Sequence, residues 1–100
     1  GKVTAIPGTA WVQRAPEILT RDVEDEVLLT AEDRSEVDVL AGTAAVVWRL
    51  LDEPITVADL VHLLADTYGA DPAVVEEDVD ALLARLADIG AVQVLADADD

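Results

Sequence analysis

The sequence contains no cysteine, methionine or phenylalanine, and these absences limit both its chemistry and its core. Without cysteine the chain forms no disulfide, thiolate nucleophile or thiolate metal site, so packing must hold it together. This composition suits a reducing compartment, and we expect a cytoplasmic protein. Only Trp11, Trp48 and Tyr68 are aromatic, so Leu, Val, Ile and Ala must build the core. With 100 residues, 52% of them hydrophobic, the chain predicts one globular domain with one core.

Basic residues are scarce as well. Six Lys and Arg stand against 22 Asp and Glu, which gives a formal net charge of −16. This charge repels phosphate groups and anionic lipid. No segment has the roughly 18–20 apolar residues that cross a bilayer, and the N-terminus lacks the basic-then-apolar order of a signal peptide. We expect neither nucleic acid nor a membrane as partner. Since residue 1 is Gly rather than Met, the sequence is compatible with a segment of a longer protein that carries a fused partner domain.

Short β-like segments occupy the first 41 residues. Turn signals at Pro7-Gly8 and Pro16 and the acidic cluster at 24–26 separate them. The last two segments flank a charged turn and are expected to form a hairpin. The predicted strands are Trp11–Arg14, Ile18–Asp22, Glu26–Thr30 and Glu36–Leu40.

From residue 43 to Gly90 the apolar residues follow the helical period. The first predicted helix, Thr43–Leu51, is apolar nearly all round and should be buried, with Arg49 as its outlet to water. Thr56 with Asp59 three residues later is an acidic variant of the capping box, so it predicts the start of a second helix. That helix should end near Tyr68.

Glycines and a proline delimit the third helix. Gly69 is the expected left-handed stop of the second helix. Asp71 should cap the third helix with Pro72 at its first position, and Gly90 should close it. The predicted core stripes are Val57, Leu60, Val61, Leu64 and Tyr68 on the second helix, and Val75, Val79, Leu82, Leu86 and Ile89 on the third.

The fold class that follows is α+β and winged-helix-like. A small antiparallel β-sheet of three to four short strands precedes three α-helices, and Val92–Leu95 is expected to return as a short wing strand. We predict an N-terminal segment with short strands at 1–25, a binding domain at 26–95 and an acidic tail at 96–100, with Asp97–Asp100 disordered.

Catalytic and metal chemistry find little support in the sequence. His62, the only histidine, is expected on the helix face opposite the core, where a solvated side chain is the simplest interpretation. Ser35, the only serine, lies in a predicted turn, whereas a carrier-protein serine sits at a helix start. The acidic clusters lack the alternating ligands and central Gly of a calcium loop. We therefore expect no catalytic residue, no metal site and no enzyme activity.

The third helix also argues against DNA binding. A recognition helix needs basic or amide side chains at its exposed positions. Between Asp71 and Ile89, Arg85 is the single cation against six acids. Such a helix is repelled by the phosphates of the groove.

A second line of residues runs along one flank of that helix: Val74, Asp78, Ala81 and Arg85. It mixes small, apolar and charged groups. One interpretation is a boundary row that covers the edge of the core. The other is one wall of a peptide groove whose second wall is the edge of the sheet.

A series of features follows in a characteristic order between about Glu26 and Val94. They are a strand ending in Leu40, Thr43-Ala44, Val47-Trp48, Leu50-Leu51, Ile55-Thr56-Val57, Leu60, Leu64, Tyr68-Gly69-Ala70-Asp71, Asp78-Val79, Leu82-Leu83, Leu86 and Ile89-Gly90. In this order and spacing the sequence resembles the PqqD family, the peptide-recognition elements of pathways that make ribosomally synthesised, post-translationally modified peptides. One position departs from the pattern: the family commonly has Asn after the strand leucine, where this chain has Ala41-Gly42. Thr43 or the backbone must then cap the first helix.

The resemblance implies a non-catalytic module without a cofactor. In the family the leader segment of a precursor peptide is added as a strand to the sheet edge and packs on the third helix. The module holds it for a separate modifying enzyme, such as a radical SAM enzyme, or for a leader peptidase. Carried onto this chain, the peptide-binding residues are Glu36, Val37, Asp38, Val39 and Leu40 on the strand and Val74, Asp78, Ala81, Leu82 and Arg85 on the helix.

Side-chain chemistry suggests how these residues select a leader. Apolar anchors are expected to pack against Val39 and Leu82, a leader carboxylate to meet Arg85, and a leader cation to meet Asp38 or Asp78. Two other functions stay open: a small acidic carrier protein modified at Ser35, and a structural subunit that stabilises a biosynthetic enzyme.

Overall fold

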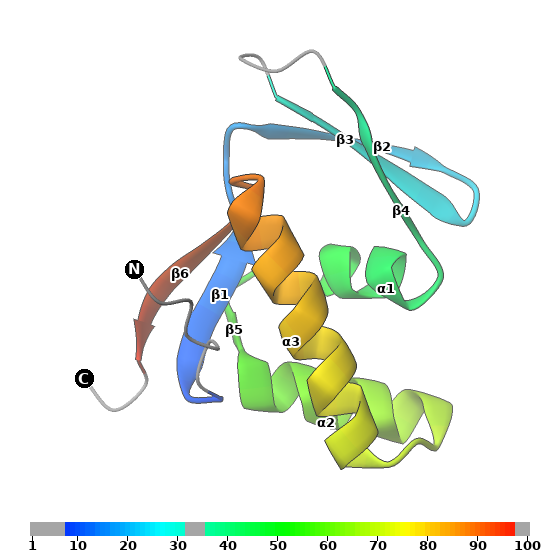
Figure 1. Cartoon of the computed structure of the whole chain (residues 1–100), viewed down its shortest axis with the longest axis vertical. Helices are drawn as coiled ribbons and strands as arrows, with labels where there is room; N and C mark the ends of the chain where they lie inside the picture. The colour runs from blue at the N-terminus through cyan, green and yellow to red at the C-terminus, as the bar shows by residue number, and fades with distance from the viewer. Residues whose placement is uncertain (1–7, 32–35, 98–100) are drawn as a thin grey trace.

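The computed structural model describes residues 8–31 and 36–97. Three helices pack beside two small antiparallel sheets (Figure 1), which confirms the predicted α+β class. The helices are α1 (Thr43–Leu50), α2 (Val57–Tyr68) and α3 (Pro72–Asp88). The strands are β1 (Ala10–Arg14), β2 (Ile18–Val23), β3 (Glu26–Ala31), β4 (Asp38–Ala41), β5 (Ile55–Thr56) and β6 (Val92–Asp97).

The strands form two sheets rather than the single sheet expected. One has the order β5-β1-β6 and the other β2-β3-β4. The chain leaves the first sheet at a turn in which the amide of Ile18 donates to the carbonyl of Ala15 at 3.2 Å. Pro16 suits the second position of such a turn. This corner directs β1 and β2 into different sheets (Figure 1).

The predicted hairpin is confirmed, and its register places β4 beside β3. Val27 pairs with Leu40 and Leu28 pairs with Val39. On its other side β3 pairs with β2 along its whole length. The domain boundary predicted at residue 25 therefore falls inside the β2–β3 hairpin.

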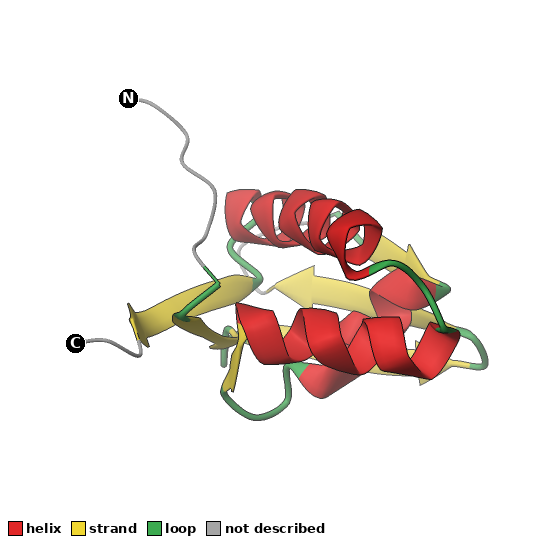
Figure 2. Ribbon diagram, turned by 90° about the horizontal axis from the view of Figure 1, so that it is seen from below, coloured by secondary structure: helices red, strands yellow, loops and turns green. Residues whose placement is uncertain are grey.

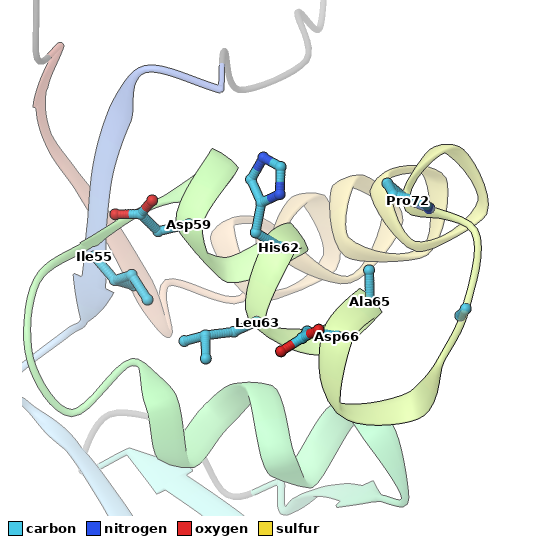
Figure 3. A pocket seen from close by; sticks show the side chains of 8 residues that line it. Ile55, Asp59, His62, Leu63, Ala65, Asp66 and Pro72 are labelled. Atoms are coloured by element: carbon cyan, nitrogen blue, oxygen red, sulfur yellow. The ribbon is translucent and has the colours of Figure 1, made fainter.

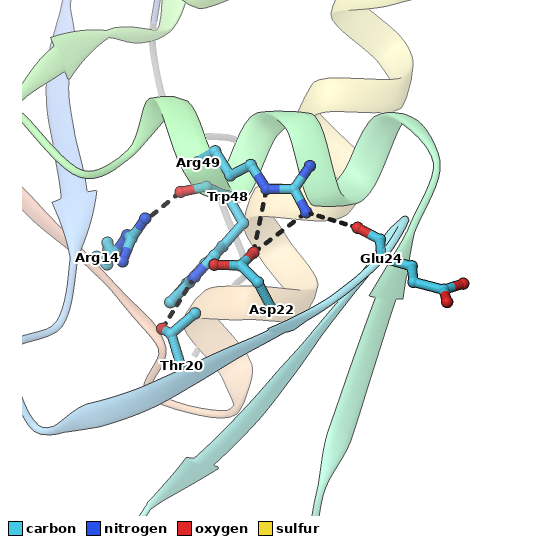
Figure 4. Close-up of polar contacts among 6 residues, drawn as sticks. All are labelled: Arg14, Thr20, Asp22, Glu24, Trp48 and Arg49. Carbon is cyan, nitrogen blue, oxygen red and sulfur yellow. Dashed lines mark hydrogen bonds and ion pairs between the residues drawn. The ribbon is translucent and has the colours of Figure 1, made fainter.

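Helix α1 joins the two sheets through Trp48, whose side chain is fully buried. Its Nε1 donates to Oγ1 of Thr20 on β2 at 3.1 Å, while Nε of Arg14 on β1 donates to the Trp48 carbonyl at 3.3 Å (Figure 4). Next to it, Nη2 of Arg49 donates to Oδ1 of Asp22 at 3.1 Å. The helix ends at Leu50, one residue earlier than predicted, and Leu51 is buried after it.

The predicted ends of α2 and α3 are confirmed. Oγ1 of Thr56 accepts a hydrogen bond from the Asp59 amide at 3.1 Å, and Gly69 closes α2 with a φ of 61°. Oδ1 of Asp71 accepts from the Ala73 amide at 3.0 Å, with Pro72 opening α3. After this short connection α3 folds back across α2 (Figure 2).

One predicted core position, Tyr68, is wrong, and Leu82 is only partly buried. Tyr68 is 52% exposed, because the last turn of α2 lies at the surface beside a hollow. On α3, Leu83 is fully buried although the predicted stripe omits it, whereas Leu82 is half-buried, packs against the core and lines the same hollow. The core otherwise follows the predicted stripes, with Leu60, Leu64, Val79 and Leu86 buried around Trp48.

The C-terminal part of the chain returns as β6, which pairs with β1 and confirms the predicted wing strand. Ala96 and Asp97, predicted to begin the acidic tail, are instead the last two residues of that strand, so the disorder predicted at Asp97 is wrong. The other predicted tail residues, 98–100, lie outside the described residues. Within residues 8–31 and 36–97, no helix is long and apolar enough to cross a membrane.

Candidate functional site

Strand β4 lies at one edge of its sheet, with β3 as its one neighbour among the described strands. It begins at Asp38, so Glu36 and Val37 precede it, and it extends to Ala41. Side chains alternate along the strand: Leu40 is buried in the core, while Val39 is 45% exposed on the opposite face. The Leu40 side chain therefore belongs to the core rather than to the edge of the sheet.

Gly42 turns the chain from β4 into α1. Its φ of 61° and ψ of −133° belong to a region that residues with a side chain avoid. Its carbonyl accepts from the amides of Ala45 and Val46 at 3.1 and 3.2 Å. Among the described residues no side chain caps this helix end, so the backbone does so, as expected from the missing Asn. The turn places Thr43 directly beyond the end of β4.

A hollow of about 330 Å³ lies at this end of β4, between all three helices. It contains three of the five predicted wall residues, Val74, Asp78 and Leu82, all on α3. The other predicted wall residues, Ala81 and Arg85, are exposed and lie outside the hollow. Its remaining lining residues are Thr43, Ala44, Val47, Leu64, Tyr68, Ala70, Val75 and Val79.

A second, much smaller depression lies at the other end of β4. Glu36 and Asp38 line it together with Ile89, which follows the last turn of α3. Residues of α3 line the hollow beyond the end of β4, and Ile89 lines the depression at its start, so α3 runs in the direction opposite to β4. The hollow thus contains predicted helix residues and the depression contains predicted strand residues, and neither contains both.

The structure also separates residues that the prediction grouped. Val39 faces the outer side of the β2-β3-β4 sheet, opposite to Leu40 and the helices, and Leu82 lies on the helix side. One anchor side chain cannot contact both. Neighbouring side chains of an added strand point to opposite faces of the sheet, so different peptide side chains would contact Val39 and Leu82.

Sequence reasoning missed the hollow's residues outside α3. The sequence pattern indicates a helix start for Thr43 and Ala44 and a core position for Tyr68, but not that they line a hollow. A tyrosine directly before a helix-ending glycine was the one available signal for Tyr68, because a phenol at the last turn tends to keep its hydroxyl in water.

A wide, open hollow of about 690 Å³ surrounds the exposed His62 on α2. Asp59 and Asp66 also line it, but the imidazole points away from Leu63 and Asp66 (Figure 3). Across the described residues, no three histidine or acidic side chains are grouped closely enough to hold a metal ion. Ser35 lies outside the described residues.

Comparison with known proteins gives consistent matches. Residues 26–92 match the family model of coenzyme PQQ synthesis protein D (PqqD). A bifunctional coenzyme PQQ synthesis protein C/D from Methylorubrum extorquens is 39% identical over 61 residues. That alignment covers 61% of this chain and 16% of the relative, so the chain spans about one sixth of that protein's length.

Two solved structures share the fold. One is TbiB1 in complex with the TbiA(β) leader peptide, with a TM-score of 0.76 and 24% identity over 85% of this chain and 99% of TbiB1. The other is the PqqD truncation of Methylobacterium extorquens PqqCD, described as a functional, stand-alone recognition element for ribosomally synthesised and post-translationally modified peptides. It has a TM-score of 0.74 and 30% identity over 90% of this chain and 96% of that one. With two thirds of its length matching the family model, the chain belongs to the PqqD family.

Proposed function

We propose that this chain binds the leader segment of a ribosomally synthesised precursor peptide and presents it to another protein. That partner is a modifying enzyme, such as a radical SAM enzyme, or a leader peptidase. The chain itself supplies no catalytic residue and no cofactor. A precursor made on the ribosome is available in the cytoplasm, and we place the module there.

The observation that carries this proposal is the pairing of an edge strand with a helix flank around a hollow. α3 runs in the direction opposite to β4. The hollow lined by α3 residues lies beyond the end of β4, and the depression lined by Glu36, Asp38 and Ile89 lies at its start. Two structures of the same fold support it, one solved with a leader peptide and one described as a recognition element.

Strand addition explains how such an edge binds a peptide. Backbone groups of an edge strand alternate between its neighbour and the open side, so an extended peptide adds a row of main-chain hydrogen bonds. The peptide's inward side chains would face α3, with Leu82 near one end of the groove. Its outward side chains would lie beside Val39 and Val37, at the close spacing of cross-strand pairs.

Charged residues along the groove would then select among leaders. Arg85 is the cation of the α3 flank and would meet a carboxylate of the peptide. Asp38 at the start of β4 and Asp78 on α3 would meet cations. With a net charge of −16, the chain favours leaders that are not strongly acidic.

A peptide-display selection with the full chain as bait tests the proposal. We expect random twelve-residue peptides to be enriched, and a synthetic copy of the most enriched one to shift the backbone amide NMR signals of β4 and α3. If no peptide is enriched, or if the shifts lie on α2 around His62 instead, the proposal is wrong.

Proline substitutions test the strand-addition step. Asp38 and Val39 are adjacent, so one points its amide toward β3 and the other toward the open side. Proline removes the backbone amide, so Asp38→Pro and Val39→Pro are made and compared. The variant that keeps native circular dichroism and melting temperature is the one in which the lost amide pointed away from β3. We expect it to bind the selected peptide at least tenfold more weakly in calorimetry, a loss of about 1.4 kcal/mol. Full-strength binding by that folded variant would place the peptide elsewhere.

A further inference from the structure

The 330 Å³ hollow between the three helices combines apolar walls with a carboxylate, a phenol and the hydroxyl of Thr43. Val47, Leu64 and Val79 are buried side chains in its lining. Asp78 is the one charged residue there, and Tyr68 adds an aromatic ring that is half-exposed. None of the described residues that line the hollow is basic.

We infer that this hollow receives an arginine side chain of the bound peptide, an assignment that rests on the proposed function. The aliphatic stem of arginine packs against the valines and leucines, as long cationic side chains do on apolar surfaces. The guanidinium reaches the Asp78 carboxylate and lies against the Tyr68 ring. Charge-assisted hydrogen bonds and cation–π contact both favour this head group.

A purely apolar anchor fits these surroundings less well. A leucine or phenylalanine that filled the hollow would bring apolar surface against Asp78 and remove part of the hydration of its carboxylate. Such a loss costs free energy without a compensating partner. Lysine supplies the charge, but its compact ammonium neither stacks on a ring nor binds a carboxylate through two parallel hydrogen bonds.

The net charge of the chain also favours a cation in the hollow. The chain carries −16 overall, and Arg85, the one cation of α3, lies outside the hollow. A peptide cation in the hollow is therefore attracted by the whole molecule as well as by Asp78. The position of the hollow, beyond the end of β4, assigns the arginine to one end of the paired segment of the peptide.

Parallel display selections on three versions of the full chain test the inference. They are the wild type, Asp78→Asn and the control Glu77→Gln, in which an exposed neighbour on α3 outside the hollow loses the same charge. We expect arginine to be enriched at one fixed peptide position on the wild type and on Glu77→Gln. On Asp78→Asn that enrichment should be lost, while the extended apolar pattern of the peptide persists.

Calorimetry with two synthetic peptides completes the test. The first is the most enriched peptide, and the second replaces its arginine by citrulline, which has nearly the same shape without the charge. We expect citrulline to weaken binding about tenfold on the wild type and less than twofold on Asp78→Asn. Equal losses on both proteins, or an apolar residue enriched at that position in all three selections, would overturn the inference.

These outcomes separate the inference from the function on which it rests. If the selected peptide shifts the β4 amide signals but shows no preference for arginine, the proposed leader binding stands. Only the assignment of an arginine to the hollow is then wrong. A selection that enriches no peptide overturns both. The citrulline measurement on the wild type needs no protein variant, so it holds even if a substitution disturbs folding.

Discussion

Leu82 and Leu83 are neighbours in sequence but have different surroundings. Leu83 is fully buried among the helices and the sheet, whereas Leu82 is half-buried and lines the large hollow. A rotation of one residue along a helix changes direction by about 100°, which separates the core from the flank. We therefore expect substitutions at Leu83 to affect folding and substitutions at Leu82 to affect binding.

We predict that Leu83→Ala lowers the free energy of unfolding by about 2–5 kcal/mol, since it leaves a cavity in the core. Leu82→Ala should cost about 1 kcal/mol and weaken binding of the selected peptide instead. Urea denaturation measures the first effect and calorimetry the second. Equal destabilisation by both substitutions would mean that Leu82, too, belongs to the core.

At the scale of elements, the junction between β4 and α1 depends on one backbone conformation. Gly42 has a positive φ, although open space surrounds the position where its Cβ would lie. A substitution at Gly42 therefore lowers stability through backbone strain and not through a steric clash of the new side chain. This junction sets the direction of α1, and with it the position of Thr43 beside the hollow.

We predict that Gly42→Ala lowers the free energy of unfolding by about 1–3 kcal/mol, the cost of forcing a residue with a side chain into this region. Gly8→Ala is the matched control: a Cβ at Gly8 would meet the Ala58 Cβ at an ordinary 3.8 Å, without a positive φ. The control should stay within about 0.5 kcal/mol of the wild type in urea denaturation. A Gly42→Ala protein as stable as the control would contradict the left-handed turn.

The elements that sequence reasoning placed correctly are those with local causes. Thr56, Gly69 and Asp71 cap or stop their helices through contacts a few residues away, so their signals are readable in the sequence. The hairpin likewise follows from two apolar segments on either side of a charged turn. The separation into two sheets was missed, because it depends on the corner at Ala15 and on the distant return of β6 to β1.

The candidate site was predictable in part for the same reason. The helical period identified the α3 flank with Asp78, and the family resemblance supplied the strand. The hollow between the flank and the other two helices depends on tertiary packing. The apolar stripe predicts Tyr68 in the core, yet none of the described residues packs over the last turn of α2 closely enough to bury it.

At the scale of the whole molecule, acidity dominates the exterior. With a net charge of −16, we predict no binding of duplex DNA or single-stranded RNA at micromolar protein concentration and moderate salt. Fluorescence anisotropy of labelled oligonucleotides checks this, with a basic DNA-binding domain as the positive control. Micromolar affinity that weakens as salt is added would contradict the prediction.

The same acidity has a consequence for the open sheet edge. An edge strand beside exposed valines is a template on which another copy of the same strand can pair, the first step of aggregation. Like charges keep two such copies apart over about a Debye length, some 8 Å at physiological ionic strength. A peptide that is neutral or basic meets no such barrier. The excess of carboxylates thus disfavours pairing between two copies of this edge strand, whereas it does not disfavour pairing with a neutral or basic peptide.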